Sequence, residues 1–149
     1  MAKTKETSTM SFEEMLAKKI GKGAIIDVEN IPPIEKFPSG CLPLDIELKG
    51  GFPKGKMVEM YADPACGKTT LAISAAKEFQ KKYPEEYIMW LDLENVYDNA
   101  YNLAIGLDTT HNFFLLRPKT GEDVWEAMIA FAKTHKGGLI VIDSVALIM

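Results

Sequence analysis

Long apolar runs are missing from this chain of 149 residues, and their absence excludes two classes of protein. No run approaches the roughly 18 residues that a membrane-spanning helix needs. The polar start, residues 1–10, also lacks the apolar segment of a secretion signal. Both absences predict a cytoplasmic protein without a membrane partner.

Cysteine is also scarce, and basic residues are fewer than acidic residues. Cys41 and Cys66 are the two cysteines, and their separation does not match the spacing of a metal site, so we expect reduced thiols. The chain carries 17 Lys and Arg residues against 21 Asp and Glu residues, which gives a net charge of -4. Proteins that bind nucleic acid usually carry a basic surface. Any DNA-binding surface must therefore be local or lie outside this chain.

A short amphipathic helix is predicted near the start. Ser11 and Glu14 have the spacing of a capping box. Four apolar residues share one face of the helix that follows, namely Phe12, Met15, Leu16 and Ile20. From the residues alone, this apolar face could pack on its own domain or on a neighbouring subunit.

The regions around this helix give weaker patterns. Residues 1–10 lack periodicity, which predicts a disordered start. A short strand is expected at 24–28, and the prolines of 30–40 indicate a connector. A short helix is expected at 42–48, ahead of a glycine-rich turn.

From residue 57 onward, apolar strands alternate with amphipathic helices. This alternation predicts an α/β fold with a parallel sheet. The last helix is expected to turn most of its apolar residues toward the core, namely Val124, Trp125, Met128, Ile129 and Phe131. The expected strands are 57–61, 87–93, 113–116 and 139–142, and the expected helices are 68–82, 100–105 and 121–133.

The most informative segment is the loop between the strand at 57–61 and the helix that follows. A helix start offers unpaired N–H groups to a polyanion, the Lys68 ammonium adds a cation, and the Thr69 hydroxyl suits Mg²⁺. The pattern therefore predicts a nucleotide-binding phosphate loop, although Ala62 stands where the full pattern has glycine. The loop and helix start comprise Ala62, Asp63, Pro64, Ala65, Cys66, Gly67, Lys68, Thr69 and Thr70.

Acidic residues follow two of the predicted strands. In open parallel sheets, ligands bind beyond the carboxyl ends of the strands. Asp143 could hold a divalent cation there, directly or through water, or it could cap the strand end together with Ser144. Glu94 could orient the water that attacks a γ-phosphate, or Asp92 and Glu94 could simply solvate a strand end.

Asp98 and Tyr101 offer a hydrogen-bond acceptor and a stacking face for a base. Residue type alone favours core or surface roles for both.

Several short motifs resemble the bacterial RecA recombinase family in their order and spacing. The resemblance covers about Ser11 to Met149 and implies the first part of a RecA-type P-loop NTPase core over 38–149. It further implies ATP-dependent filament assembly on single-stranded DNA, for homologous recombination and DNA repair. The motifs are Gly21-Lys-Gly-Ala-Ile, Pro38-Ser-Gly-Cys-Leu-Pro-Leu-Asp-Ile, the phosphate loop, Leu91-Asp-Leu-Glu-Asn-Val-Tyr-Asp-Asn-Ala-Tyr and Val141-Ile-Asp-Ser-Val.

The resemblance also implies a cofactor set and roles for individual residues. ATP and Mg²⁺ would contact Lys68 and Thr69, Asp143 would belong to the metal site, and Glu94 would be the catalytic carboxylate. Gly67 and the other residues of the phosphate loop would hold the triphosphate.

Asp98 and Tyr101 match the adenine-contacting positions of the family. The segment 11–37 resembles the amino-terminal element that packs on an adjacent protomer, which implies a homo-oligomeric filament.

Three residues depart from the family pattern. Ala62 replaces a glycine, Cys66 a usual serine, and Asn99 a proline that commonly precedes the adenine-side tyrosine. The resemblance also places the DNA-binding loops, a further core strand and a carboxyl-terminal domain beyond Met149. We therefore expect this segment alone to be poorly stable and to bind ATP weakly.

Two other functions fit the same residues. The chain could be a non-catalytic module that docks through its amino-terminal helix on full-length recombinase subunits. It could also be another RecA-fold ATPase, such as a helicase-like or clock-type relative.

Overall fold

The computed structural model describes residues 10–21, 29 and 31–145, and the chain divides into two units, Met1–Ile34 and Glu35–Met149. The expected strand at 24–28 and nearly all of the expected disordered start lie outside the described residues. No helix within the described ranges is long and apolar enough to cross a membrane.

The first unit contains helix α1, Phe12–Ile20, as the sequence predicts. Its capping box is present: the Glu14 N–H donates to Ser11 Oγ, and the Ser11 N–H donates to Glu14 Oε2, both at 3.1 Å. No residue of α1 is buried, and Phe12 is 72% exposed. The apolar face of this helix is therefore open.

The second unit is built on a parallel sheet with the strand order β4-β3-β5. The strands are β3, Tyr87–Asp92, β4, Phe113–Leu116, and β5, Gly138–Asp143. The register pairs Asp92 with Asp143 at the carboxyl ends of the neighbouring strands β3 and β5. Two acidic residues that are distant in sequence thus meet at one edge of the sheet.

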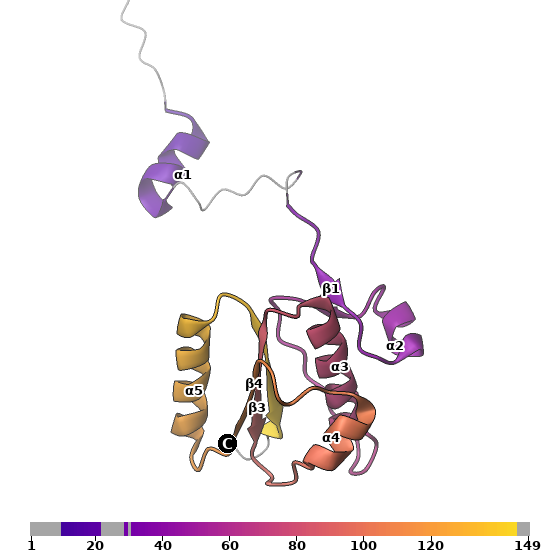
Figure 1. Cartoon of the computed structure of the whole chain (residues 1–149). Coiled ribbons are helices and arrows are strands. Elements are labelled where there is room, and N and C mark those ends of the chain that lie inside the picture. Colours follow the sequence, from indigo (N-terminus) through magenta and orange to yellow (C-terminus); the bar gives the residue numbers. More distant parts are fainter. Residues whose placement is uncertain (1–9, 22–28, 30, 146–149) are drawn as a thin grey trace, which may run out of the picture. The chain divides into compact units, whose positions relative to one another are not determined.

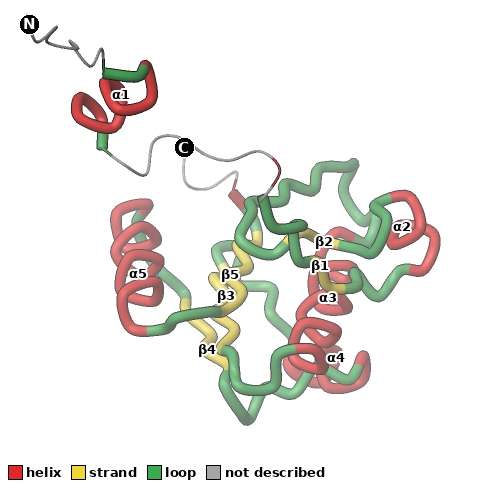
Figure 2. Tube along the Cα trace, turned by 90° about the horizontal axis from the view of Figure 1, so that it is seen from above, coloured by secondary structure: helices red, strands yellow, loops and turns green. Residues whose placement is uncertain are grey.

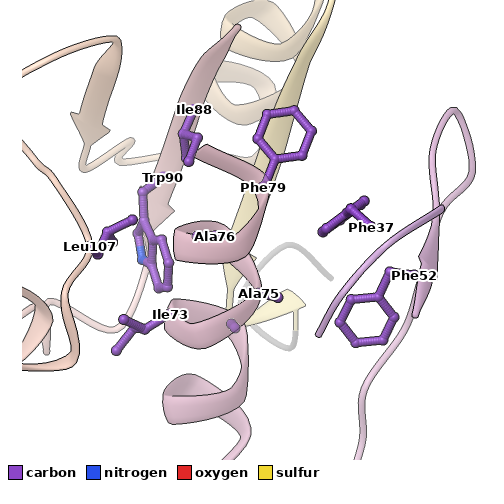
Figure 3. Packing of buried hydrophobic residues seen from close by; sticks show 10 residues of the cluster. Phe37, Phe52, Ile73, Ala75, Ala76, Phe79, Ile88, Trp90 and Leu107 are labelled. Atoms are coloured by element: carbon purple, nitrogen blue, oxygen red, sulfur yellow. The ribbon is translucent and has the colours of Figure 1, made fainter. Parts of the chain in front are cut away.

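Helices cover both faces of this sheet (Figures 1 and 2). Helices α3, Lys68–Lys82, and α4, Asn99–Ile105, lie on one face, and α5, Gly121–Thr134, lies on the other. Alternate side chains of β3 pack on the two opposite faces of the sheet. Ile88 and Trp90 pack in the cluster with α3 (Figure 3), whereas Met89 and Leu91 pack in the cluster with α5. The α/β prediction is confirmed.

A small antiparallel pair corrects the prediction of a plain connector over 30–40. Strand β1, Lys36–Phe37, pairs with β2, Phe52–Pro53, and the short predicted helix between them is α2, Leu42–Glu47. The Phe37 ring packs edge-on against Phe79 of α3 at 5.2 Å between centroids. The prolines of 30–40 suggested a connector, but this aromatic packing and the pairing with β2 order two of its residues as a strand.

The predicted strand at 57–61 is not formed. Met57 and Tyr61 are 89% and 90% exposed, and the segment belongs to neither sheet. A strand exists only when its backbone N–H and C=O groups pair with a neighbour. Among the described residues, β5 has β3 as its sole partner and presents no strand to 57–61.

Fewer apolar side chains of α5 are buried than the sequence predicts. Val124 and Phe131 are buried, but Trp125 and Ile129 are 55% and 52% exposed. The β4-β3-β5 sheet is too narrow to cover the full apolar width of this helix, so the expectation for these two residues is wrong.

Candidate functional site

The loop before α3 has the backbone shape of a tight turn into a helix. Gly67 is the N-cap of α3 with a φ of 87°, and Ala65 has a φ of 62°. Both values lie in the left-handed region, where an L side chain costs roughly 1–2 kcal/mol. Ala62 is not among the described residues with a positive φ. The Cβ at the atypical position 62 therefore does not force backbone strain.

The Lys68 side chain folds back over this loop. Its Nζ donates hydrogen bonds to the carbonyl oxygens of Ala62 at 2.9 Å and Asp63 at 3.1 Å. The ammonium has three N–H donors, so one remains for an anion while the two carbonyl bonds are kept. Within the described part of the chain, Lys68 thus contacts loop carbonyls and forms no ion pair with a carboxylate.

Thr69 connects the helix start to the end of β5. Its Oγ1 donates to Oδ2 of Asp143 at 2.9 Å. A hydroxyl and a carboxylate at this separation are oxygen ligands of the type that Mg²⁺ prefers, with waters and phosphate oxygens completing the shell. The described residues contain no group of three or more His, Cys, Asp or Glu side chains that could hold a metal by themselves. Thr69 and Asp143 therefore offer one hydroxyl oxygen and one carboxylate oxygen at this position.

Glu94 lies next to this pair. The Ser144 hydroxyl donates to Glu94 Oε1 at 2.6 Å, and the Leu93 N–H donates to the Asp143 carbonyl at 2.8 Å. Glu94 is exposed, so its carboxylate is accessible to water and to a ligand. The structure brings Thr69, Asp143, Ser144 and Glu94 into one connected hydrogen-bonded group.

Asp98 and Tyr101 both belong to the amino-terminal turn of α4. Asp98 is its N-cap and accepts from the N–H groups of Ala100 and Tyr101 at 2.9 and 3.2 Å. The Tyr101 hydroxyl is hydrogen-bonded to Thr70 Oγ1 at 2.9 Å, and the residue is 46% exposed. Its ring is therefore held beside the phosphate loop.

The structure corrects the interpretation of Asp92 as a carboxylate that only solvates a strand end. Asp92 is 1% exposed and accepts hydrogen bonds from the N–H groups of Val96 and Tyr97, at 3.0 and 3.3 Å. Arg117 Nε donates to Asp92 Oδ2 at 2.9 Å. Residue type and position at the strand end did not reveal this burial, because it depends on how β4 and the loop after β3 close over the carboxylate.

Arg117 was missed altogether by sequence reasoning. The available signal was that it is the chain's single arginine and directly follows the strand predicted at 113–116. An arginine at a strand end, one strand away from an aspartate, has the fork geometry that suits a buried carboxylate.

These features define an α/β protein with a parallel sheet, a Gly-Lys-Thr helix start, and acidic residues gathered at the carboxyl ends of two neighbouring strands. The chain belongs to the RecA N-terminal domain family, whose sequence model matches residues 8–149. The family predicted from the sequence motifs is thereby confirmed.

Curated relatives carry the name Protein RecA. The protein from Oceanobacillus iheyensis is 37% identical over 98% of this chain and 42% of its own length. The protein from Gloeothece citriformis is 34% identical over 95% of this chain and 40% of its own length. The protein from Corynebacterium urealyticum is 38% identical over 88% of this chain and 35% of its own length. The chain thus spans less than half of the length of these relatives.

Proposed function

We propose that this chain is the ATP-binding amino-terminal part of a RecA-like DNA recombinase. The observation that carries the proposal is the hydrogen bond from Thr69 to Asp143, which joins the start of α3 to the carboxyl end of β5. An Mg²⁺-bound triphosphate needs this combination of a hydroxyl, a carboxylate and a helix N-terminus. Membership of the RecA N-terminal domain family supports the same reading.

In this proposal each site residue meets one need of the nucleotide. The loop N–H groups and Lys68 bind the phosphates, and Thr69 and Asp143 hold Mg²⁺, which would neutralise charge on the phosphate oxygens. Glu94 orients and partly deprotonates the attacking water. Asp98 and Tyr101 contact the adenine, with Tyr101 offering its ring face beside Thr70.

The partners follow from the recombinase assignment. Single-stranded DNA would be bound through regions outside this chain, because the chain itself carries a net charge of -4. The complete protein would act in the cytoplasm. The segment 11–37 would join neighbouring protomers into a filament. The open apolar face of α1 supports this, since Phe12 and Ile20 are 72% and 64% exposed.

An apolar groove within the second unit supports the proposal that such an element binds there. An open groove of about 490 Å³ lies between β4 and α5. Phe114 and Leu115 of the edge strand β4 line it and are 42% and 41% exposed. Apolar side chains along an unpaired strand edge are typical of a surface that binds another chain.

The test measures ATP hydrolysis, with and without single-stranded DNA, by the longest protein that the gene encodes. We expect DNA to stimulate turnover, Lys68→Ala to abolish it, and Glu94→Gln to reduce it strongly while nucleotide still binds. Glu126→Gln on the exposed side of α5 is the matched control and should leave turnover unchanged. Unchanged turnover in both site variants would defeat the assignment.

The exposure of α1 also favours a second candidate, a non-catalytic module that docks on full-length recombinase subunits. Co-purification with such a recombinase, lost when Phe12 and Leu16 are both changed to Asp, would support this function. ATP turnover by the chain without a partner would oppose it.

A further inference from the structure

Asp92 is a buried carboxylate that lies just outside the proposed nucleotide site. It ends β3 and is 1% exposed, and two of its hydrogen-bond donors are the backbone N–H groups of Val96 and Tyr97. Neutral N–H groups satisfy its oxygens but do not balance its charge. A carboxylate removed from water is costly unless a cation compensates it.

Arg117 supplies that cation. Leu116 at the end of β4 is in register with Leu91, so the next residue on each strand, Arg117 and Asp92, is brought side by side. Arg117 Nε donates to Asp92 Oδ2 at 2.9 Å. The arginine is 51% exposed while the aspartate is enclosed, so the guanidinium covers the carboxylate on its solvent side.

The loop that Asp92 holds is the loop that carries Glu94. Bonds from Val96 and Tyr97 to Asp92 fix its far end, and the bond from the Leu93 N–H to the Asp143 carbonyl fixes its near end. Glu94 lies between these anchors. Its direction toward the site therefore depends on both of them.

We propose that Arg117 is a positioning residue for Glu94, acting through Asp92. The guanidinium keeps the Asp92 carboxylate in the orientation that binds the Val96 and Tyr97 N–H groups, and the loop then presents Glu94 toward Asp143 and Ser144. The functional half of this inference rests on the proposed role of Glu94 in ATP hydrolysis. The structural half does not.

The structural half is tested by amide hydrogen exchange of the longest protein that the gene encodes, read residue by residue. In Arg117→Met, exchange at Val96 and Tyr97 should become about tenfold faster, whereas the β3 amides of Trp90 and Leu91 keep their rates. Arg117→Lys, which retains the charge and a donor, should restore most of the protection. Lys119→Met, which removes a nearby exposed cation, should change neither set of amides.

Two results of this experiment would overturn the proposal. One is unchanged exchange at Val96 and Tyr97 in Arg117→Met. The other is equal acceleration in the loop and in β3, because Arg117 would then support the sheet as a whole rather than the loop.

The functional half is tested by steady-state kinetics of the longest protein that the gene encodes. Arg117→Met should lower kcat about ten- to a hundredfold and leave KM for ATP nearly unchanged. In a Glu94→Gln background it should cause no further loss. A full additional loss in that background would show that Arg117 does not act through Glu94.

The two experiments separate the two proposals. If the unaltered protein hydrolyses no ATP, the proposed function fails, and the exchange rates still decide whether Arg117 holds the loop. If turnover is present but insensitive to Arg117→Met, the positioning role fails and the proposed function stands.

Discussion

Thr69 Oγ1 donates a 2.9 Å hydrogen bond to Oδ2 of Asp143, although 74 positions separate the two residues in the sequence. This bond connects the first turn of α3 to the last residue of β5. The bond places a hydroxyl oxygen and a carboxylate oxygen next to each other at the start of α3. A cation bound here would take a lone pair from each oxygen in place of this hydrogen bond, and the hydroxyl would keep its proton.

Thr69→Val is the sharpest single test of this relationship. Valine keeps the branched shape but removes the hydroxyl, so Asp143 loses its donor and a cation loses a ligand. In the longest protein that the gene encodes, we expect the affinity for ATP to fall about tenfold in the presence of Mg²⁺ and to change less than about twofold without it. Titration calorimetry with and without Mg²⁺ measures both values. Thr69→Ser keeps the hydroxyl and should behave like the unaltered chain.

Lys68→Ala should weaken ATP binding without a large change in the stability of the fold. Among the described residues, the Lys68 ammonium bonds to carbonyls of an exposed loop, so its loss should change the free energy of unfolding by less than about 0.5 kcal/mol. The affinity for ATP should nevertheless fall at least about tenfold, because a phosphate partner is lost. Lys56→Ala removes an exposed lysine upstream of the loop and is the matched control. Equal affinities in the two variants would contradict the phosphate-loop assignment.

The corrected packing of α5 gives a prediction for stability. Ile73 of α3 is 1% exposed and Ile129 of α5 is 52% exposed. Ile73→Val should lower the free energy of unfolding by about 1 kcal/mol, since it removes a buried methylene. Ile129→Val should change it by less than about 0.5 kcal/mol. Urea denaturation measures both, and equal costs would mean that Ile129 is buried in solution.

The lowered pKa of Asp108 predicts how stability depends on pH in acid. Hydrogen bonds from the Thr110 hydroxyl and N–H, followed by a bond with His111, lower the pKa of Asp108 from 3.8 to about 2. A lowered pKa means that folding favours the carboxylate, so this contribution to stability is complete above about pH 4 and is lost as the pH falls toward 2. The unaltered chain should therefore lose stability more steeply in that window than Asp108→Asn.

The carboxyl carbon shift of Asp108, followed by NMR, gives the midpoint directly. Glu126→Gln, which removes an exposed acid on α5, should retain the steep acid response. A midpoint near 4 for Asp108 would contradict the hydrogen-bonded turn.

Elements whose patterns are local were predictable from the sequence. Helix α3 occupies the predicted span because Tyr83-Pro84 stops it, and α5 begins after the predicted Thr120 cap, where Asp123 completes a capping box. The buried strand β3 was equally predictable, because a strand covered on both faces is apolar throughout. The signals for these elements lie within the elements themselves.

Features that depend on a distant neighbour were not predictable. The segment 57–61 is apolar enough for a strand, but strand formation requires a paired backbone, which no described residue supplies. Asp92 and Arg117 are 25 positions apart, and only the register of β3 and β4 brings them together. The types of the site residues could be read from the sequence, whereas their hydrogen-bonded partners could not.

Cys66 offers the most direct test of where a nucleotide binds. Its thiol is free and exposed, one residue before Gly67, so a triphosphate on the loop would cover it. In a Cys41→Ser background, we expect saturating ATP with Mg²⁺ to slow maleimide labelling of Cys66 at least about tenfold, because a covered thiol reacts only when the ligand has left. Mass spectrometry follows the labelling.

The control uses the reverse background, Cys66→Ser. There, ATP should not change the rate of Cys41 labelling, since Cys41 precedes α2 and lies outside the loop. Protection of both thiols would indicate a general tightening of the fold, and protection of neither at saturating ATP would place the nucleotide elsewhere.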